Sequence, residues 1–162
     1  KTSYYQSIIE VIDAFEKAGL LDRLLIVPHN KFAQYFKENF KKYAHIIDTN
    51  PTEALKNSII FITDYSSIIY DAIYRGAYPI FYWKEKDYLI KNYKAMPPLN
   101  ESNAPGPIAY DEAELIDVIN KAIDGNYILN EEHNHNYEEI NEFKDNQNTK
   151  RVIEKLIEDK VL

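Results

Sequence analysis

Short apolar runs that alternate with helical patterns most constrain the fold of this chain. Strands are predicted at residues 24–27, 44–49, 59–63 and 78–83, where such runs occur. Runs of this length fit β-strands, and a strand that is apolar throughout is buried on both faces. Strands buried in this way belong to parallel sheets that helices cover from both sides. The pattern therefore predicts a doubly wound, Rossmann-like α/β domain.

Helical patterns predict the helices of the domain: one includes residues 8–15, four others begin near residues 31, 50, 66 and 111, and more helix is expected after residue 130. Asn50 and Asp111 occupy positions that favour helix N-caps. Gly19, Gly76 and Gly125 follow helical patterns and are expected to end them. Residues 84–110 are rich in proline and are predicted to be irregular.

The composition narrows the class of protein. A length of 162 residues with 45% hydrophobic content fits a single domain over residues 1–162. The net charge of -7 argues against nucleic-acid binding, and the absence of cysteine excludes disulfides and thiolate metal sites. No apolar run approaches the ~18 residues that a membrane span needs. Because the chain opens abruptly within a helical pattern, we expect it to be a fragment of a larger enzyme.

A polar cluster follows the apolar run 59–63 just where a helix is predicted to start. Its side chains are Thr63, Asp64, Ser66 and Ser67. Ligands of open parallel sheets bind at the carboxyl ends of the strands, and a helix N-terminus with nearby hydroxyls suits a phosphate. The alternative is that Asp64 or Ser66 simply caps the helix, and the local pattern alone favours capping.

The histidines offer a second set of candidates. His29 follows the predicted strand 24–27 and would share the sheet edge with Asp64, where it could donate a hydrogen bond to a phosphate. A packed or solvated ring is the common alternative. His133 and His135 lie in a polar stretch, and we expect a solvent-exposed pair there rather than a metal site.

Four segments resemble the nucleotide-binding half of the CDP-glycerol glycerophosphotransferases, the teichoic-acid polymerases and primases of cell-wall synthesis. They read LLIVPH, IIFITDYSSIIYDAIYRGAYPIFYW, ESNAPGPIAYDEAELIDVI and DNQNTKRVIEKL, in the same order as in the family. The resemblance implies the C-terminal half of a GT-B-type fold of two Rossmann-like domains. It also implies transfer of glycerol phosphate from CDP-glycerol to a teichoic-acid or related acceptor, with release of CMP.

The resemblance further implies partners and a location. The N-terminal domain would bring a lipid-linked polymer acceptor, so the full-length enzyme would be cytoplasmic and peripheral at the inner face of the membrane. The donor is a substrate, and no cofactor is expected. The sequence lacks clustered carboxylates of the kind that hold Mg²⁺, so we predict metal-independent donor binding. The fragment alone is expected to be inactive.

The site residues follow from the same resemblance. His29 would be the catalytic contact to the donor diphosphate, and Glu101 would lie near the ribose or the alcohol. The expected substrate-binding residues are Thr63, Asp64, Ser66, Ser67, Glu101, Asn148, Thr149 and Arg151. The alternative for Arg151 is an ion pair with Glu154 or Glu158 on its own helix.

Two other functions fit the same fold. A GT-B glycosyltransferase would use the same strand ends for a nucleotide sugar and would prefer UDP or GDP to CDP. A non-catalytic α/β binding module, such as a receiver-like domain, would need more acidic residues at the strand ends. Departures from the family pattern at Asn30 and Asn146 leave the polyol open between glycerol, ribitol and others.

Overall fold

A three-stranded parallel sheet lies at the centre of the molecule. The computed structural model describes residues 3–94 and 97–161. Strands β1 (Ile60–Thr63), β2 (Tyr78–Tyr82) and β3 (Ile108–Ala109) pair in the order β1-β2-β3. The helices are α1 (Ser3–Lys17), α2 (Ala33–Asn39), α3 (Pro51–Asn57), α4 (Ile68–Tyr74), α5 (Lys86–Tyr93), α6 (Glu112–Asp124), α7 (Glu131–Glu138) and α8 (Asn148–Glu158). The α/β fold class predicted from the sequence is confirmed.

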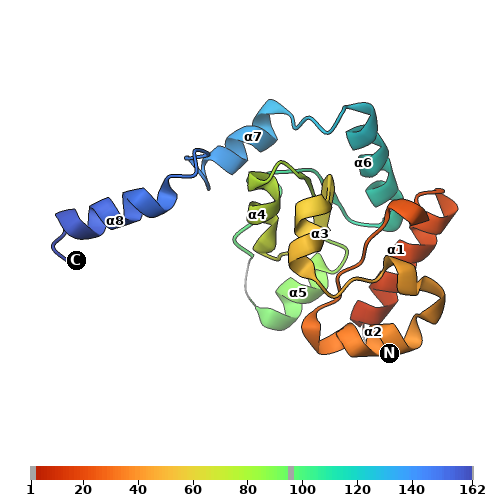
Figure 1. Ribbon diagram of the computed structural model, residues 1–162. Coiled ribbons are helices and arrows are strands. Elements are labelled where there is room, and N and C mark those ends of the chain that lie inside the picture. Colours follow the sequence, from red (N-terminus) through yellow and green to blue (C-terminus); the bar gives the residue numbers. More distant parts are fainter. Residues whose placement is uncertain (1–2, 95–96, 162) are drawn as a thin grey trace.

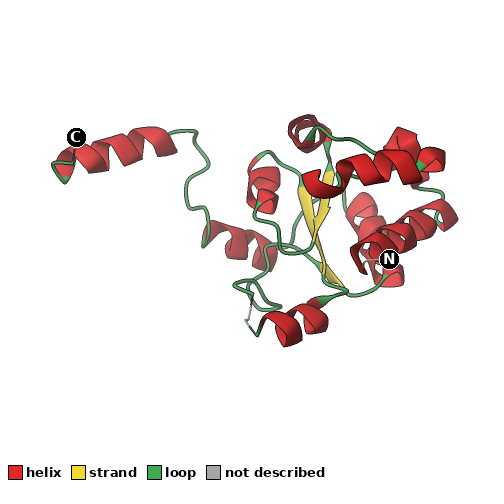
Figure 2. Cartoon of the chain, turned by 90° about the horizontal axis from the view of Figure 1, so that it is seen from below, coloured by secondary structure: helices red, strands yellow, loops and turns green. Residues whose placement is uncertain are grey.

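Helices cover both faces of the sheet, as Figure 2 shows. Side chains alternate along a strand, so neighbouring residues face opposite sides. Ile60, Ile62 and Ile80 face a core built with α1 and α6. Phe61 and Phe81 face a second core built with α4. The burial of apolar side chains on both sides explains why the strands read as continuous apolar runs.

The predicted helix caps are confirmed. The Asn50 side chain accepts a hydrogen bond from the Glu53 N–H at 3.3 Å, and the Asp111 side chain accepts one from the Glu114 N–H at 2.8 Å. Gly76 follows α4 with a φ of +93°, a conformation that favours glycine. These local signals therefore set the helix boundaries independently of the core.

Two predicted strands are wrong. Residues 24–27 and 44–49 form one parallel bridge, Ile26 to Ile47, and the first half of the second segment belongs to a 3-10 helix (Lys41–Ile46). Leu25 and Val27 remain 45% and 37% exposed, so no layer covers their side of the segment. His29 therefore follows no strand of the sheet, and the strand order gives no reason to place it at the same edge as Asp64.

The stretch 84–110, predicted to be irregular, contains α5 and β3. The two-residue β3 follows a segment made of Ala104, Pro105, Gly106 and Pro107, which we call the 104–107 segment; its first three residues are buried and Pro107 is partly buried. A Cβ on Gly106 would lie 2.7 Å from the carbonyl oxygen of Pro79 in β2, so only glycine permits this approach. The prolines that suggested a loop in fact accompany a backbone packed against the sheet.

The C-terminal helices differ in how they join the body. Tyr137 of α7 is buried, and its hydroxyl donates to the backbone carbonyl of Tyr70 at 3.3 Å. Helix α8 projects away from the body (Figure 1), and its approach is held by Tyr74, whose hydroxyl accepts from the Asn146 N–H at 3.2 Å. None of the helices within 3–94 and 97–161 combines the length and the apolar character of a membrane span.

Candidate functional site at the carboxyl edge of the sheet

The residues that directly follow the three strands meet at one edge. Asp64 follows β1, Trp83 follows β2 and Tyr110 follows β3, and the strand register places these positions alongside one another. The Trp83 backbone N–H donates to the Ala109 carbonyl at 2.8 Å, and its indole N–H donates to the Asp64 carbonyl at 2.9 Å. Trp83 thus ties the three strand ends together.

Residues 63–67 run from the last residue of β1 to the start of α4, and this segment, which we call the 63–67 turn, presents exposed polar groups. Ser66 and Ser67 are exposed, and neither hydroxyl has a hydrogen-bond partner within the described part of the chain. The Asp64 side chain contacts only the Thr63 hydroxyl there, at 3.5 Å. The capping interpretation of Asp64 and Ser66 is therefore wrong, since neither these residues nor Ser67 makes a side-chain cap for α4.

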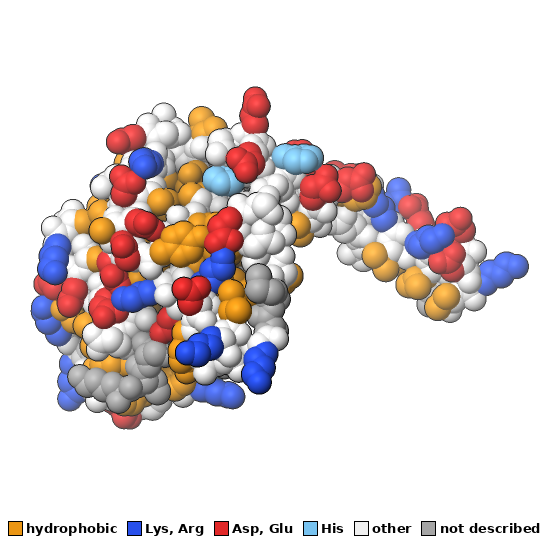
Figure 3. All heavy atoms as spheres, turned by 180° about the vertical axis from the view of Figure 1, so that it is seen from behind, with side chains coloured by type: hydrophobic (Ala, Val, Ile, Leu, Met, Phe, Trp, Pro, Cys, Tyr) orange, Lys and Arg blue, Asp and Glu red, His pale blue; other side chains and the backbone are white. Residues whose placement is uncertain are grey.

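Beside this turn lies a pocket of about 260 Å³. Side chains from the ends of β2 and β3, from α5 and from the loop before β3 line it: Trp83, Lys84, Lys86, Asp87, Glu101 and Tyr110. It combines acidic, basic and aromatic groups. On the face of the body that Figure 3 shows, acidic and basic side chains are likewise interspersed.

Glu101 is held as an ionised acceptor in the pocket. Its carboxylate pairs with the Lys86 ammonium and accepts from the Tyr110 hydroxyl at 2.6 Å. The hydrogen bonds from Lys86 and Tyr110 lower the pKa of Glu101 to about 2. The Lys86 ammonium also lies 5.4 Å from the centre of the Trp83 ring. A ligand in the pocket would therefore meet a fixed negative acceptor and a nearby cationic donor.

Tyr65 lies behind the pocket wall. Its ring stacks on Trp83 with the centroids 5.1 Å apart and the planes at 12°. Its hydroxyl is buried and has no hydrogen-bond partner among the residues that the structure describes. Burial, followed by the charges of Glu101, Asp64 and Asp87, raises the pKa of Tyr65 to about 12. The phenol is therefore neutral at physiological pH.

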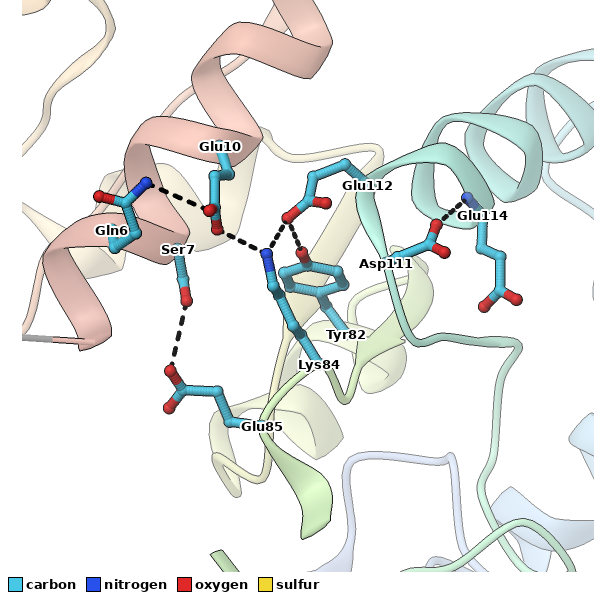
Figure 4. A network of polar contacts seen from close by, with 9 residues as sticks. All are labelled: Gln6, Ser7, Glu10, Tyr82, Lys84, Glu85, Asp111, Glu112 and Glu114. Carbon is cyan, nitrogen blue, oxygen red and sulfur yellow. Dashed lines mark hydrogen bonds and ion pairs between the residues drawn. The ribbon is translucent and has the colours of Figure 1, made fainter. Parts of the chain in front are cut away.

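A second polar network, shown in Figure 4, joins elements beside the site. Lys84 pairs with Glu10 of α1 and Glu112 of α6, and the Tyr82 hydroxyl donates to Glu112 at 2.6 Å. Its members satisfy one another and connect both helices to β2. We assign this network to holding the core together.

The structure does not bring the α8 residues to the 63–67 turn. Asn148, Thr149 and Arg151 lie on the projecting helix, whose approach is anchored at Tyr74. Tyr74 ends α4, whereas Ser67 precedes its start, and a helix of seven residues spans about 10 Å. The substrate-binding role of these three residues stays a prediction.

Arg151 has a partner that the sequence did not suggest. Its Nη1 donates to Asp145 at 2.9 Å and to Asn148 at 3.1 Å, and Nη2 also pairs with Asp145. The alternative of an ion pair with Glu154 or Glu158 is therefore wrong, because Arg151 pairs with Asp145 instead. The Arg151 pair lowers the pKa of Asp145 to about 2.

The histidines fall into two groups. His29 is exposed, its Nδ1 accepts from the Lys31 N–H at 3.3 Å, and its ring packs edge-on to Phe32. Its catalytic role stays a prediction. His135 is exposed as predicted, but His133 is partly buried, and this burial lowers its pKa. Across 3–94 and 97–161 no three His, Asp or Glu side chains gather as a metal would require.

Sequence reasoning missed much of the pocket. Trp83, Lys86 and Tyr110 lie in a stretch predicted to be irregular or at the very end of a strand, and Tyr65 drew no attention inside a polar cluster. The position directly after each strand was the available signal, because such positions share one sheet edge.

Comparison with known families finds one match. A family model described as CDP-Glycerol:Poly(glycerophosphate) glycerophosphotransferase matches residues 10–158. No curated protein matches the chain, and no solved structure does.

Proposed function

The chain belongs to the CDP-glycerol:poly(glycerophosphate) glycerophosphotransferase family, and from this membership we propose that its sheet edge binds a CDP-linked polyol donor. The family assignment confirms the resemblance expected from the sequence and makes the chain a transferase of the glycerophosphotransferase kind. The donor role, the identity of the polyol and the acceptor are the proposed parts.

The observation that carries the proposal is the pair of exposed hydroxyls at Ser66 and Ser67. They lie at the carboxyl end of β1, the usual ligand edge of a parallel sheet, and have no partners within 3–94 and 97–161. Each hydroxyl can donate to a phosphate oxygen. The Asp64 carboxylate would repel a phosphate, so we assign Asp64 a backbone role, with its carbonyl fixed by Trp83.

The reaction is an in-line phosphoryl transfer. An acceptor hydroxyl oxygen forms a bond to the phosphorus of the glycerol phosphate, and the bridging bond to CMP breaks. The leaving CMP takes the bonding electron pair, and the acceptor proton passes to a base. Such transfers depend on alignment and on neutralising the phosphate charge. Thr63, Ser66 and Ser67 would hold the diphosphate, and His29 would contact it.

The remaining parts of the enzyme are assigned by the same proposal. Glu101 would accept hydroxyls of the ribose or of the alcohol. A preceding domain would present a lipid-linked teichoic-acid acceptor, and the whole enzyme would work peripherally at the inner face of the membrane. Donor binding would need no metal ion.

A nucleotide panel tests this function. The protein is heated with CDP-glycerol, CDP, UDP or GDP, and the unfolding midpoint is measured with and without EDTA. A ligand at a hundredfold excess over its Kd stabilises the folded state by about 2.7 kcal/mol. We expect the CDP compounds to stabilise the protein with or without EDTA.

Each other outcome contradicts a specific part. Stronger stabilisation by UDP or GDP would favour a nucleotide-sugar glycosyltransferase. Stabilisation by none of the nucleotides would rule out donor binding by this chain. Loss of the CDP effect in EDTA would show that the donor needs a metal.

A further inference from the structure

One buried polar group of the site has no role in the fold. The Tyr65 hydroxyl is buried without a partner among the residues of 3–94 and 97–161. Buried polar atoms in native proteins almost always have partners, because leaving one unpaired destabilises the folded state. Such an atom next to a binding pocket is a candidate ligand contact.

Tyr65 adjoins the pocket through Trp83. The Tyr65 ring stacks on the Trp83 ring at 5.1 Å, and Trp83 is itself a lining residue. Trp83 also donates its indole N–H to the carbonyl of Asp64, the residue before Tyr65. Tyr65 therefore lies against the pocket wall, although it belongs to the turn that follows β1.

The chemistry of the pocket favours a neutral group rich in hydroxyls. Two carboxylates line the pocket, Asp87 and Glu101, while the ammonium of Lys84 is already paired with Glu10 and Glu112 and that of Lys86 with Glu101. A phosphate would face both carboxylates, whereas a ligand hydroxyl can donate to a carboxylate and accept from an ammonium at once. The volume of about 260 Å³ is below the ~300–1,000 Å³ of most small-molecule sites, so it suits one small group.

We propose that Tyr65 is a specificity-determining residue whose hydroxyl pairs with a hydroxyl of a neutral 1,2-diol bound in this pocket. The inference rests on the proposed donor-binding function and adds a residue to it. Both the ribose and a glycerol unit of a CDP-linked donor carry such a diol. Because the Tyr65 hydroxyl is covered in the free protein, the ligand reaches it through a side-chain shift in the pocket wall.

Tyr65→Phe gives the proposal a signature that a purely structural residue would not show. The free variant loses an unpaired buried hydroxyl and keeps the ring stacking, so its Tm should rise by about 2–4 °C. Its affinity for CDP-glycerol should fall about threefold to tenfold, because one ligand hydrogen bond is lost. Tyr70→Phe, in the same apolar cluster, is the matched control and should leave this affinity unchanged.

Calorimetry with four ligands identifies the diol: CDP-glycerol, CDP, 2′,3′-dideoxy-CDP and pyrophosphate. An affinity loss confined to CDP-glycerol assigns the polyol. A loss that extends to CDP and is absent with dideoxy-CDP assigns the ribose. In both cases pyrophosphate binding should not change.

Unchanged affinity of Tyr65→Phe for all four ligands would overturn the inference and leave the proposed function standing. A lower Tm in the free variant would show that the hydroxyl has a partner in the folded protein, and would also overturn it. If the wild-type protein bound none of the nucleotides, the proposed function and the inference would fall together.

Discussion

The 63–67 turn and the 104–107 segment both contribute to the family resemblance, but they differ in how their residues are used. Ala104, Pro105 and Gly106 are buried against β2, and the Ala104 carbonyl accepts from the Asn136 side chain of α7 at 3.1 Å. In the turn, by contrast, Ser66 and Ser67 are exposed and their hydroxyls are unpaired within the described residues. One segment is committed to packing, and the other leaves polar groups free for a ligand.

The contrast separates two kinds of polar group around the sheet edge. Those around Lys84 satisfy one another and connect α1, β2 and α6. The hydroxyls of Tyr65, Ser66 and Ser67, by contrast, have no partners within the described part of the chain. A polar group that the fold does not use is the better indicator of function, since a native core otherwise pairs its polar atoms.

The largest effect is expected from Gly106→Ala. The new Cβ would clash with the Pro79 carbonyl oxygen at 2.7 Å and with Pro79 Cγ at 2.8 Å. Because β2 is central to the sheet and cannot easily move, the variant should lose about 2–3 kcal/mol of stability, measured by urea unfolding. Gly125→Ala is the control, because its nearest contact is 3.1 Å and its φ of -84° suits alanine.

Wild-type stability of the Gly106→Ala protein would contradict the difference between the two regions, since the 104–107 segment could then no longer be called a packing element. The affinity of the folded variant for CDP adds a second readout. It should match the wild-type value, because Gly106 touches β2 rather than the pocket.

The substitution Trp83→Phe should affect both the 63–67 turn and the 104–107 segment. Phenylalanine keeps an aromatic ring beside Tyr65 but removes the hydrogen bond to the Asp64 carbonyl. The loss of that bond and of buried ring volume should cost about 2 kcal/mol. Faster amide exchange limited to residues 64–67 would show that the indole holds the turn. Equal exchange in the variant and the wild type would show that the turn is held by other contacts.

Local chemistry was predictable from the sequence where it acts over a few residues. The caps at Asn50 and Asp111 and the stop at Gly76 depend on neighbouring residues, and the structure confirms them. The strands β1 and β2 were found because both are apolar on two faces. The predictions failed where tertiary contacts decide: the 24–27 run lacks a covering layer, and β3 depends on the approach of Gly106 to Pro79.

The candidate site was predictable only in part for the same reason. The 63–67 turn stands out because its polar residues are consecutive and follow an apolar strand. The pocket draws Trp83, Glu101 and Tyr110 from separate segments, so only the strand register brings them together. The alternative partner for Arg151 was wrong because its helix offered Glu154 or Glu158, while Asp145 lies in the loop before the helix.

The double variant Ser66→Ala and Ser67→Ala tests the 63–67 turn, the region of the comparison that leaves polar groups free. Exposed hydroxyls without partners add little to stability, so unfolding should change by less than about 0.5 kcal/mol. Loss of their hydrogen bonds to the donor phosphates should weaken CDP-glycerol binding about tenfold, close to 1.4 kcal/mol. Ser58→Ala is the contrasting control, because that hydroxyl donates to the Ala54 carbonyl at 2.6 Å and its loss should affect stability alone. Unaltered nucleotide affinity in the double variant would remove the turn from the site.

The smallest effect is expected from Tyr110→Phe and concerns a single proton. Hydrogen bonds from Lys86 and then Tyr110 lower the pKa of Glu101 to about 2. Removing the phenol should raise that pKa, but Lys86 should still keep it below the ordinary ~4.3.

The shift also makes stability depend on pH. A carboxyl group whose pKa is lower in the folded state stabilises the protein at pH values above its unfolded pKa, and this stabilisation is lost as the pH falls through its folded pKa. The loss begins near the unfolded value in both proteins, so in the variant it should be smaller and should be complete at a higher pH within the window between about 4 and 2. Carboxyl NMR titration measures the shift, and Asp145, whose pKa of about 2 is set by Arg151 away from the pocket, provides the internal reference. A shift at Glu101 but not at Asp145 would show that the pocket tunes its own acceptor. Equal shifts at both carboxyls would mean that the substitution acts on the whole fold, and the contrast between site and scaffold would then not extend to Tyr110.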